Sequence, residues 1–140
     1  MPQPPDLRIH PIGTVRSSLR SLEEAPRQSV EGAPEAWLEL DPAFADGLDG
    51  ISAGAEIIVL TWLHRADRTV LRVHPRGETE RPLAGVFATR SPDRPNPIGL
   101  HRVTVLEVRV DTGVRVDALE AIDGTPIADI KPVLGGATGD

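Results

Sequence analysis

Residues 102–119, with the sequence RVTVLEVRVDTGVRVDAL, contain the pattern that decides the fold. Two runs rich in valine flank Asp111-Thr112-Gly113, a sequence typical of a tight turn between antiparallel strands. We therefore predict a β-hairpin with arms Arg102–Val110 and Val114–Leu119.

The first arm of this hairpin changes phase along its length. Val103 and Val105 follow one phase of the two-residue strand period, whereas Leu106, Val108 and Val110 follow the other. A change of phase moves side chains from one face of a sheet to the other unless an extra residue is inserted. The pattern predicts a β-bulge near Leu106, which would increase the curvature of the sheet.

The rest of the chain consists of short apolar segments bounded by turn residues, with 14 prolines and 13 glycines spread over its 140 residues. No window of useful length has strong helical periodicity, although Pro42–Leu48 could form one helical turn. Many short strands in a chain of this size are typical of a closed barrel, which leaves no exposed sheet edges. We predict an all-β fold of one domain, residues 1–140: a small antiparallel β-barrel with short helical turns and flexible tails at 1–6 and 134–140. The further predicted strands are Leu7–Val15, Ala36–Leu40, Ile57–Leu63, Thr69–His74 and Gly85–Thr89.

Composition excludes several kinds of protein. Cysteine is absent, which excludes disulfides, thiolate metal sites and cysteine nucleophiles. The sequence has no apolar run long enough to span a bilayer, and we expect no membrane partner. The N-terminus lacks the basic start and apolar stretch of a signal peptide, so we expect a cytoplasmic protein.

The net charge of −6 hides an uneven distribution of charge. Between Glu23 and Glu56 there are nine acidic residues and one basic residue, Arg27. Between Leu63 and Val103 there are eight arginines and four acidic residues. The average charge and the four aromatic residues argue against a nucleic-acid partner. The arginine-rich stretch is either a solvated surface that reflects composition bias or a binding surface for an anionic ligand.

Common motifs of cofactor binding and catalysis are absent. No predicted strand leads into a Gly-x-Gly-x-x-Gly turn or a phosphate-binding P-loop. The four histidines lack metal-ligand spacing with a third ligand, so we expect no metal site. No serine lies in a nucleophile-elbow sequence.

One loop is unusually stiff and polar. Residues 85–100 read GVFATRSPDRPNPIGL, and three prolines restrict the backbone between the arms of this segment. A stiff loop loses little entropy when its side chains bind a ligand. The loop is therefore either a preorganised binding loop or a rigid surface connection. Its polar side chains are Arg90, Asp93, Arg94 and Asn96.

A second polar cluster lies in residues 121–132, AIDGTPIADIKP. It combines an Asp-Gly turn with Asp129 and Lys131, which are two residues apart. On a strand these two side chains point to the same face and could form an ion pair.

These two clusters together resemble the TsaA-like family, whose characterised members are TrmO-type tRNA methyltransferases. The resemblance covers about residues 8–133, and its most specific part is the block at 85–100. The other matching segments are Ile12-Gly13-Thr14-Val15-Arg16-Ser17, Ala25-Pro26-Arg27-Gln28 and Ile57–His64.

The resemblance implies a small antiparallel β-barrel that binds S-adenosyl-L-methionine without a Rossmann sheet. It implies a homodimer with the cofactor near the subunit interface, and tRNA rather than DNA as the partner. The implied reaction transfers a methyl group to N6 of N6-threonylcarbamoyladenosine, next to the tRNA anticodon.

The resemblance also assigns residues. Arg27 or Arg90 could bind the cofactor carboxylate, and Glu120 or Asp123 could accept from the ribose hydroxyls or the ammonium group. The acceptor nitrogen must lose a proton, which His64 or Asp129 could accept. The backbone groups of Leu100, Ala121 and Ile122 could bind the adenine edge. The implied cofactor-binding residues are Pro26, Arg27, Gln28, His64, Arg65, Arg90, Leu100, Glu120, Ala121, Ile122 and Asp123. The candidates for catalysis and substrate orientation are His64, Arg94, Asn96, Asp129 and Lys131.

The chain departs from the family pattern at several positions. Residue 120 is Glu where Asp is common, residue 133 is Val where Tyr is common, and we expect the chain to lack the extra C-terminal domain of longer members. His101 and Arg102 stand where small or apolar residues are common. Two alternatives therefore stay open: the same barrel acting on a small molecule or other acceptor, and a non-catalytic module that binds S-adenosyl-L-methionine.

Overall fold

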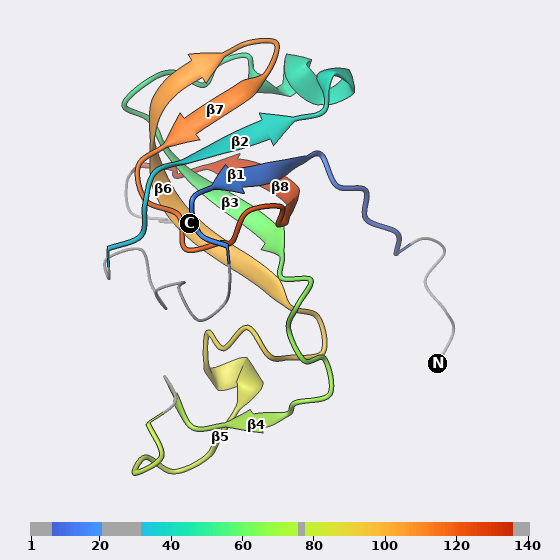
Figure 1. Cartoon of the computed structure of the whole chain (residues 1–140), viewed down its shortest axis with the longest axis vertical. Helices are drawn as coiled ribbons and strands as arrows, with labels where there is room; N and C mark the ends of the chain where they lie inside the picture. Colours follow the sequence, from blue (N-terminus) through green and yellow to red (C-terminus); the bar gives the residue numbers. More distant parts are fainter. Residues whose placement is uncertain (1–6, 21–31, 76–77, 136–140) are drawn as a thin grey trace.

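The computed structural model of the protein describes residues 7–20, 32–75 and 78–135. Within these ranges six strands close into an antiparallel barrel, in the order β1-β2-β7-β6-β3-β8 around its wall (Figure 1). The predicted all-β barrel is therefore confirmed. The barrel strands are β1 (Gly13–Ser17), β2 (Ala36–Leu40), β3 (Glu56–Trp62), β6 (Ile98–Arg109), β7 (Gly113–Val116) and β8 (Pro126–Pro132).

The predicted hairpin forms two neighbouring barrel strands, β6 and β7. Their register shifts between Val105 and Glu107, so the predicted bulge near Leu106 is confirmed. The turn ends at Gly113, whose φ is +145°, and a Cβ atom there would lie 1.9 Å from the backbone oxygen of Leu38. Glycine is needed at this position because both the backbone angle and the close approach of β2 exclude a side chain.

The core lies inside the barrel and consists of aliphatic side chains from every wall strand. Burial of their apolar surface is the main source of stability in a fold of this kind. Valine and isoleucine suit the wall because β-branched side chains pack well on a pleated surface. The largest fully buried apolar side chains are Leu38, Ile57, Leu119, Ile127, Val15, Val59, Val86, Val105, Val114 and Val116.

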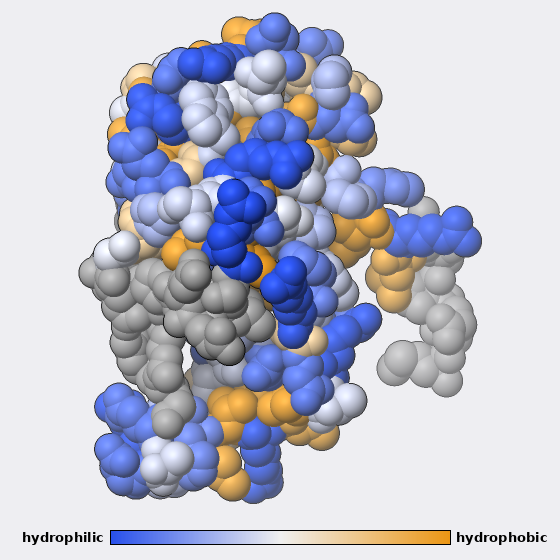
Figure 2. Space-filling model, in the orientation of Figure 1, coloured by the Kyte–Doolittle hydropathy of each residue, from blue (hydrophilic) through white to orange (hydrophobic). Residues whose placement is uncertain are grey.

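The connection between β3 and β6, residues 63–97, forms a lobe beyond one end of the barrel (Figure 1). It contains the two-stranded sheet of β4 (Arg72–Val73) and β5 (Ala84–Gly85) and the 3₁₀ segment η4 (Val86–Ala88). Hydrophobic residues gather on the visible face of the lobe (Figure 2). Three large apolar side chains of the lobe are exposed: Leu71, Leu83 and Phe87.

Four predicted strands are wrong in their bounds or type. The hairpin arm predicted at 114–119 ends at Val116, the last residue of β7. The strand predicted at 7–15 begins only at Gly13, where its pairing with β2 starts. The strand predicted at 69–74 is confined to β4, because the Asp67 carboxylate accepts from Thr69 N (2.8 Å) and holds a turn there. The strand predicted at 85–89 ends at Gly85, where η4 begins. The first carbonyl of η4, that of Val86, accepts a hydrogen bond from Thr89 N and not from an N–H of a neighbouring strand.

Other predictions agree more closely with the structure. Strand β2 has the predicted bounds, and the helical turn predicted at 42–48 is the 3₁₀ segment η2 (Pro42–Leu48). Strand β6 begins four residues before the predicted arm, and β8 was not predicted as a strand of its own. The predicted tails fall mostly at 1–6 and 136–140, outside the described residues. Within the described ranges, no helix has the length and apolar character needed to cross a membrane.

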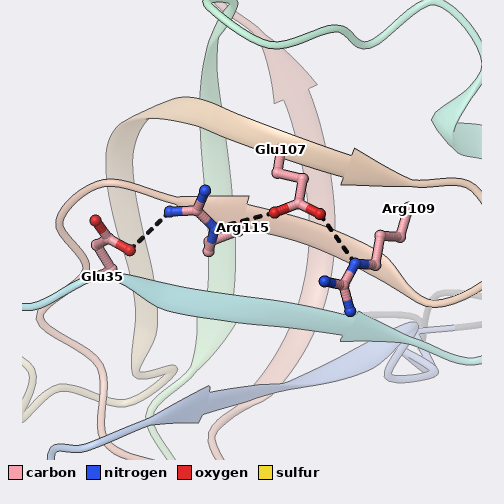
Figure 3. Close-up of polar contacts among 4 residues, drawn as sticks. All are labelled: Glu35, Glu107, Arg109 and Arg115. Atoms are coloured by element: carbon pink, nitrogen blue, oxygen red, sulfur yellow. Dashed lines mark hydrogen bonds and ion pairs between the residues drawn. The ribbon is translucent and has the colours of Figure 1, made fainter.

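A row of ion pairs crosses the outer face of β6 and β7 (Figure 3). Arg115 Nη1 lies 2.8 Å from Glu35 Oε1, and its Nε lies 3.4 Å from Glu107 Oε1. Arg109 Nε lies 3.0 Å from the other Glu107 oxygen. The hydrogen bond from Arg109 is the main cause that lowers the pKa of Glu107 below its ordinary value of 4.5. Exposed pairs of this kind contribute little each, so they assist rather than determine the register.

Candidate functional site

Several of the predicted site residues lie where the chain leaves the barrel and returns to it. His64 and Arg65 follow the end of β3, and Asn96 precedes the start of β6. Because β3 and β6 are paired, with Trp62 opposite Ile98, these two points lie at the same end of the barrel. The candidate site therefore lies between this end and the lobe.

The backbone of Leu100 lies at an edge of β6 that no strand of the described residues covers. β6 pairs with β3 over residues 98–104 and with β7 only over residues 105–109. Leu63 N donates to Pro97 O (2.8 Å), so these two residues form a hydrogen-bonded pair. The hydrogen-bonded pairs keep the same alternation to the other end of the pairing between β3 and β6. Bonded pairs alternate in an antiparallel ladder, so the N–H and C=O of Leu100 point away from β3. They offer one donor and one acceptor side by side.

The segment that follows β7 runs along this uncovered edge. Thr104 has the same phase as Leu100, and its N–H donates to Asp117 Oδ1 (2.9 Å) while its carbonyl accepts from Asp117 N (3.1 Å). Farther along, Leu119 N donates to Pro34 O (3.0 Å). Residues 120–123, four of the implied cofactor-binding residues, therefore follow directly from the segment that borders the edge.

Asp123 fixes the end of this segment. Its Oδ1 accepts from Ser17 N (3.0 Å), its Oδ2 lies 3.7 Å from Arg20 Nη1, and its own N–H donates to Leu19 O (2.8 Å). The side chains of Ala121 and Ile122 are buried. Only backbone groups of these two residues could contact a ligand, as we predicted for an adenine edge.

Glu120 belongs to a buried polar cluster that bridges β3 and β6. Its Oε1 lies 2.7 Å from His101 Nδ1, and His101 Nε2 lies 2.7 Å from Thr61 Oγ1. Its second oxygen, Oε2, is buried and has no hydrogen-bond partner among the described residues. An unpaired buried carboxylate oxygen is costly, so it marks a place where a ligand donor would be stabilising.

The stiff loop is held by one of its own predicted site residues. Arg94 donates through Nη2 to the backbone oxygen of Val86 and to that of Thr89 (2.6 Å). The Thr89 hydroxyl also donates to Val86 O (3.0 Å). Arg94 is therefore committed to the backbone of η4, which differs from the predicted role in orienting a substrate. The three prolines and this arginine together fix the loop.

Asn96 and Asp93 tie the loop to the start of the lobe. Arg68 donates to Pro95 O (2.7 Å) and to Asn96 Oδ1 (3.1 Å), and its guanidinium lies 5.1 Å from the ring centre of Trp62. Asp93 Oδ1 accepts from the backbone N–H of residue 67 (2.8 Å). The loop is thus held in one shape by contacts on both sides, which agrees with the stiffness predicted from its prolines.

Three of the predicted site residues are exposed. His64, Arg65 and Arg90 make no polar contact with the other described residues and lie on the surface. The positive charges of Arg65 and Arg90 are thus available to an anionic ligand, because no carboxylate of the described residues neutralises either of them. The nearby Asp67 is engaged by Thr69, whose side-chain and backbone hydrogen bonds lower the pKa of Asp67 below 3.8.

Asp129 and Lys131 lie on a different face from Glu120. Lys131 Nζ lies 3.3 Å from Asp129 Oδ2, so the predicted ion pair is confirmed. In register Asp129 is opposite Leu60 on β3, and Ile130 between the pair packs against the core. The pair therefore projects from the outer wall, whereas His101 projects into the barrel. One chain does not bring the two sets of residues together.

Two further features complete the region. The predicted cofactor-binding residues Pro26, Arg27 and Gln28 lie outside the described residues. A hollow of about 310 Å³ lies beside the site, but it contains none of the predicted residues. Its lining is apolar: Leu7, Ile9, Pro11, Trp62, Pro126, Ile127 and Ala128.

Sequence reasoning did not assign a role to His101, Thr61 or Arg68. The first two form the buried cluster with Glu120, and Arg68 holds the stiff loop. A histidine in the inward phase of an apolar strand was the available signal, because His101 shares that phase with Val103 and Val105. Its partner could not be found from local sequence, since Thr61 lies 40 residues away.

The chain is similar to proteins of known family. Residues 14–137 match the family described as "tRNA-methyltransferase O N-terminal domain". A protein of Archaeoglobus fulgidus named "S-adenosyl-L-methionine-binding protein" is 46% identical over 123 residues, which cover 88% of this chain and 86% of that protein. A protein of Methanothermobacter thermautotrophicus named "Probable S-adenosyl-L-methionine-binding protein" is 44% identical over 127 residues, with 91% and 90% of the two chains covered.

A solved structure shares the fold. The crystal structure of TrmO from Pseudomonas aeruginosa superposes with a TM-score of 0.73 at 30% identity. The match covers 92% of this chain and 56% of that chain. The chain thus spans little more than half the length of this TrmO.

Proposed function

Because the chain belongs to the tRNA-methyltransferase O N-terminal domain family, we propose that it binds S-adenosyl-L-methionine and transfers a methyl group to tRNA. We further propose that the acceptor is N6 of N6-threonylcarbamoyladenosine, next to the anticodon. The observation that carries the proposal is the uncovered edge of β6 beside Glu120, whose second carboxylate oxygen lacks a partner among the described residues.

The residues at this edge fit the chemical groups of the cofactor. An adenine ring presents an amino donor next to ring-nitrogen acceptors, which suits the paired C=O and N–H of Leu100. Ribose hydroxyls or an ammonium group would supply the donor that Glu120 Oε2 lacks. Arg90, which is exposed and makes no polar contact with the other described residues, suits the carboxylate of the methionine part.

The protein's part in the reaction is mainly to position the two reactants. When bound, S-adenosyl-L-methionine supplies an electrophilic methyl group on a sulfonium. The loop fixed by Arg94 and Arg68 holds its shape before binding, so little entropy is lost when the reactants are aligned. His64 at the end of β3 and Asp129 on the outer wall are the two candidates to accept the proton from the acceptor nitrogen.

The exposed cations support RNA as the acceptor. Arg65 follows the end of β3 and Arg90 belongs to the stiff loop, and both are exposed and unpaired within the described residues. Cationic side chains that are not neutralised attract phosphates and displace counterions. The acidic residues of the chain are concentrated elsewhere, between Glu23 and Glu56.

We infer that two copies of the chain form the complete site. Glu120 contacts the inward-facing His101 of β6, whereas the Asp129–Lys131 pair lies on the outer side of β8, and a second copy could bring one set near the other. Ile98 and Leu100 are 44% and 47% exposed on the outer face of β6, and Phe87 on the lobe is 83% exposed. Apolar side chains in this number favour a protein interface. Sedimentation velocity should show a dimer that Phe87→Asp weakens, whereas a monomer at high concentration would exclude this assembly.

Two measurements test the proposed function. Calorimetry with S-adenosyl-L-methionine should show binding, and no binding at millimolar ligand would reject both cofactor and reaction. Nucleosides from a strain that lacks the protein should lose the methylated form of threonylcarbamoyladenosine. If that nucleoside persists at the wild-type level, tRNA is not the necessary substrate. Binding without turnover on modified tRNA would instead favour a non-catalytic module, in line with the names of the two archaeal relatives.

A further inference from the structure

His101 is the central residue of a buried polar cluster inside an apolar barrel. Its side chain is 4% exposed, and that of Glu120 is 17% exposed. Thr61, which is fully buried, contacts the other ring nitrogen. Burying polar groups in a core costs free energy unless each group has a hydrogen-bond partner. A buried polar cluster with an unpaired oxygen therefore requires a functional or structural explanation.

Gly99 provides the space for the cluster. It is the register partner of Thr61 on β3, and it precedes His101 by two residues on the same face of β6. A Cβ atom at Gly99 would lie 2.3 Å from Thr61 Oγ1 and 2.7 Å from His101 Nε2. The missing side chain therefore lets the imidazole reach across to β3. The imidazole of His101 is thus held in one orientation by Thr61, Gly99 and Glu120 together.

The hydrogen-bond roles follow from the chemistry of the groups. An ionised carboxylate can only accept, so His101 Nδ1 donates to Glu120 Oε1 (2.7 Å). With the ring proton on Nδ1, Nε2 is the acceptor for the hydroxyl of Thr61 (2.7 Å). Each group of this chain of contacts has a partner except the far oxygen of Glu120, which is buried and unpaired among the described residues.

We propose that His101 is a positioning residue that holds Glu120 by one oxygen so that the other accepts a hydroxyl of the bound nucleoside. This rests on the proposed function, because the nucleoside is the adenosine part of the cofactor, which carries the ribose hydroxyls. The flexible side chain of a glutamate has several rotamers, which must be restricted if one oxygen is to face the ligand. The imidazole supplies that restriction from inside the barrel. The wall of the barrel thus sets the position of the ligand-facing oxygen.

Two substitutions at position 101 separate this role from simple packing. In His101→Asn the side-chain amide can place an N–H near the position of Nδ1 and keep the bond to Glu120. In His101→Gln the amide reaches toward the position of Nε2, so the contact with Thr61 is kept and the one with Glu120 is lost. Both variants remove the ring and keep a polar side chain, so each is a control for the other.

The test compares the binding of S-adenosylhomocysteine with that of its 2′-deoxy and 3′-deoxy analogues by calorimetry. The wild-type chain should prefer the parent ligand over one of the analogues by about tenfold or more, as expected for a hydrogen bond to a charged group. His101→Gln should reduce this preference to about twofold or less, and His101→Asn should retain most of it. If His101→Gln does not fold, Thr61→Val takes its place, because it frees the ring and should also reduce the preference.

Several results would overturn the inference. An unchanged preference in a folded His101→Gln protein would show that the imidazole does not position Glu120. Equal binding of all three ligands to the wild-type chain would show that Glu120 accepts no ribose hydroxyl. Failure of the wild-type chain to bind the parent ligand at all would overturn the proposed function as well. The first two results leave cofactor binding intact, so the two failures can be told apart.

Discussion

Arg94 offers the sharpest distinction between a residue that binds substrate and one that holds a loop. Its guanidinium donates to the backbone oxygens of Val86 and Thr89, and its Nε is buried without a partner among the described residues. A hydrogen bond from a charged group contributes about 1.5–3 kcal/mol. Arg94→Ala removes two such bonds and leaves two carbonyl groups without these donors. We expect the free energy of local opening of the loop to fall by about 3 kcal/mol.

Hydrogen exchange followed by mass spectrometry measures this change directly. A loss of about 3 kcal/mol should accelerate exchange in residues 86–97 by about 100-fold, because each 1.4 kcal/mol corresponds to a factor of ten. Amides of β7 should stay protected over the same time course, since opening the loop exposes none of the barrel core. Arg94→Lys is the control: it keeps the charge but not the fork, so exchange should be intermediate. Unchanged exchange in the loop of Arg94→Ala, with methyl transfer abolished, would refute the bracing role and restore a substrate role.

Three further predictions concern separate parts of the chain. Arg90→Ala should weaken S-adenosyl-L-methionine binding by more than tenfold without lowering Tm, whereas Arg72→Ala, an exposed arginine on the same lobe, should leave both unchanged; an unchanged Kd for Arg90→Ala would remove it from the site. Gly113→Ala should lower the free energy of unfolding in urea by about 2 kcal/mol or more, because its φ of +145° and the carbonyl 1.9 Å from a new Cβ both oppose a side chain. Gly47→Ala, with nothing within 4 Å of its Cβ, should change it by less than about 0.5 kcal/mol, and equal effects would contradict the account of the turn. The lowered pKa of Glu107 means that its contribution to stability is present above pH 4.5 and is lost as pH falls through the lower folded value. Glu107→Gln should therefore flatten the loss of stability between about pH 5 and pH 3 in urea titrations, and an identical slope would show that the ion pairs do not matter.

Local patterns predicted the parts of the fold that depend on neighbouring residues. The alternation of valines in residues 102–119 determines the hairpin, and the change of phase at Leu106 determines the bulge. The start of β6 could not be found in this way, because residues 98–101 mix glycine, histidine and two aliphatic residues and become a strand by pairing with β3. Strand β8 likewise depends on its neighbours β1 and β3, which are far away in sequence.

In the candidate site, too, local features could be predicted from the sequence and long-range contacts could not. The stiffness of the loop follows from its prolines, and its position follows from the ends of β3 and β6. The role of Arg94 as a brace could not be predicted, because η4 replaced the expected strand and placed two carbonyls within reach of its guanidinium. The cluster of Thr61, His101 and Glu120 joins three parts of the chain that meet only when the barrel closes.

Transfer of the methyl group in a purified system tests the central claim most directly. The chain is incubated with S-adenosyl-L-methionine and tRNA that carries threonylcarbamoyladenosine, and the nucleosides are then analysed by mass spectrometry. Our account predicts that this nucleoside becomes heavier by one CH₂ group with time, and that Glu120→Ala slows the conversion strongly. A protein that binds S-adenosyl-L-methionine but leaves the nucleoside unchanged would contradict the proposed reaction.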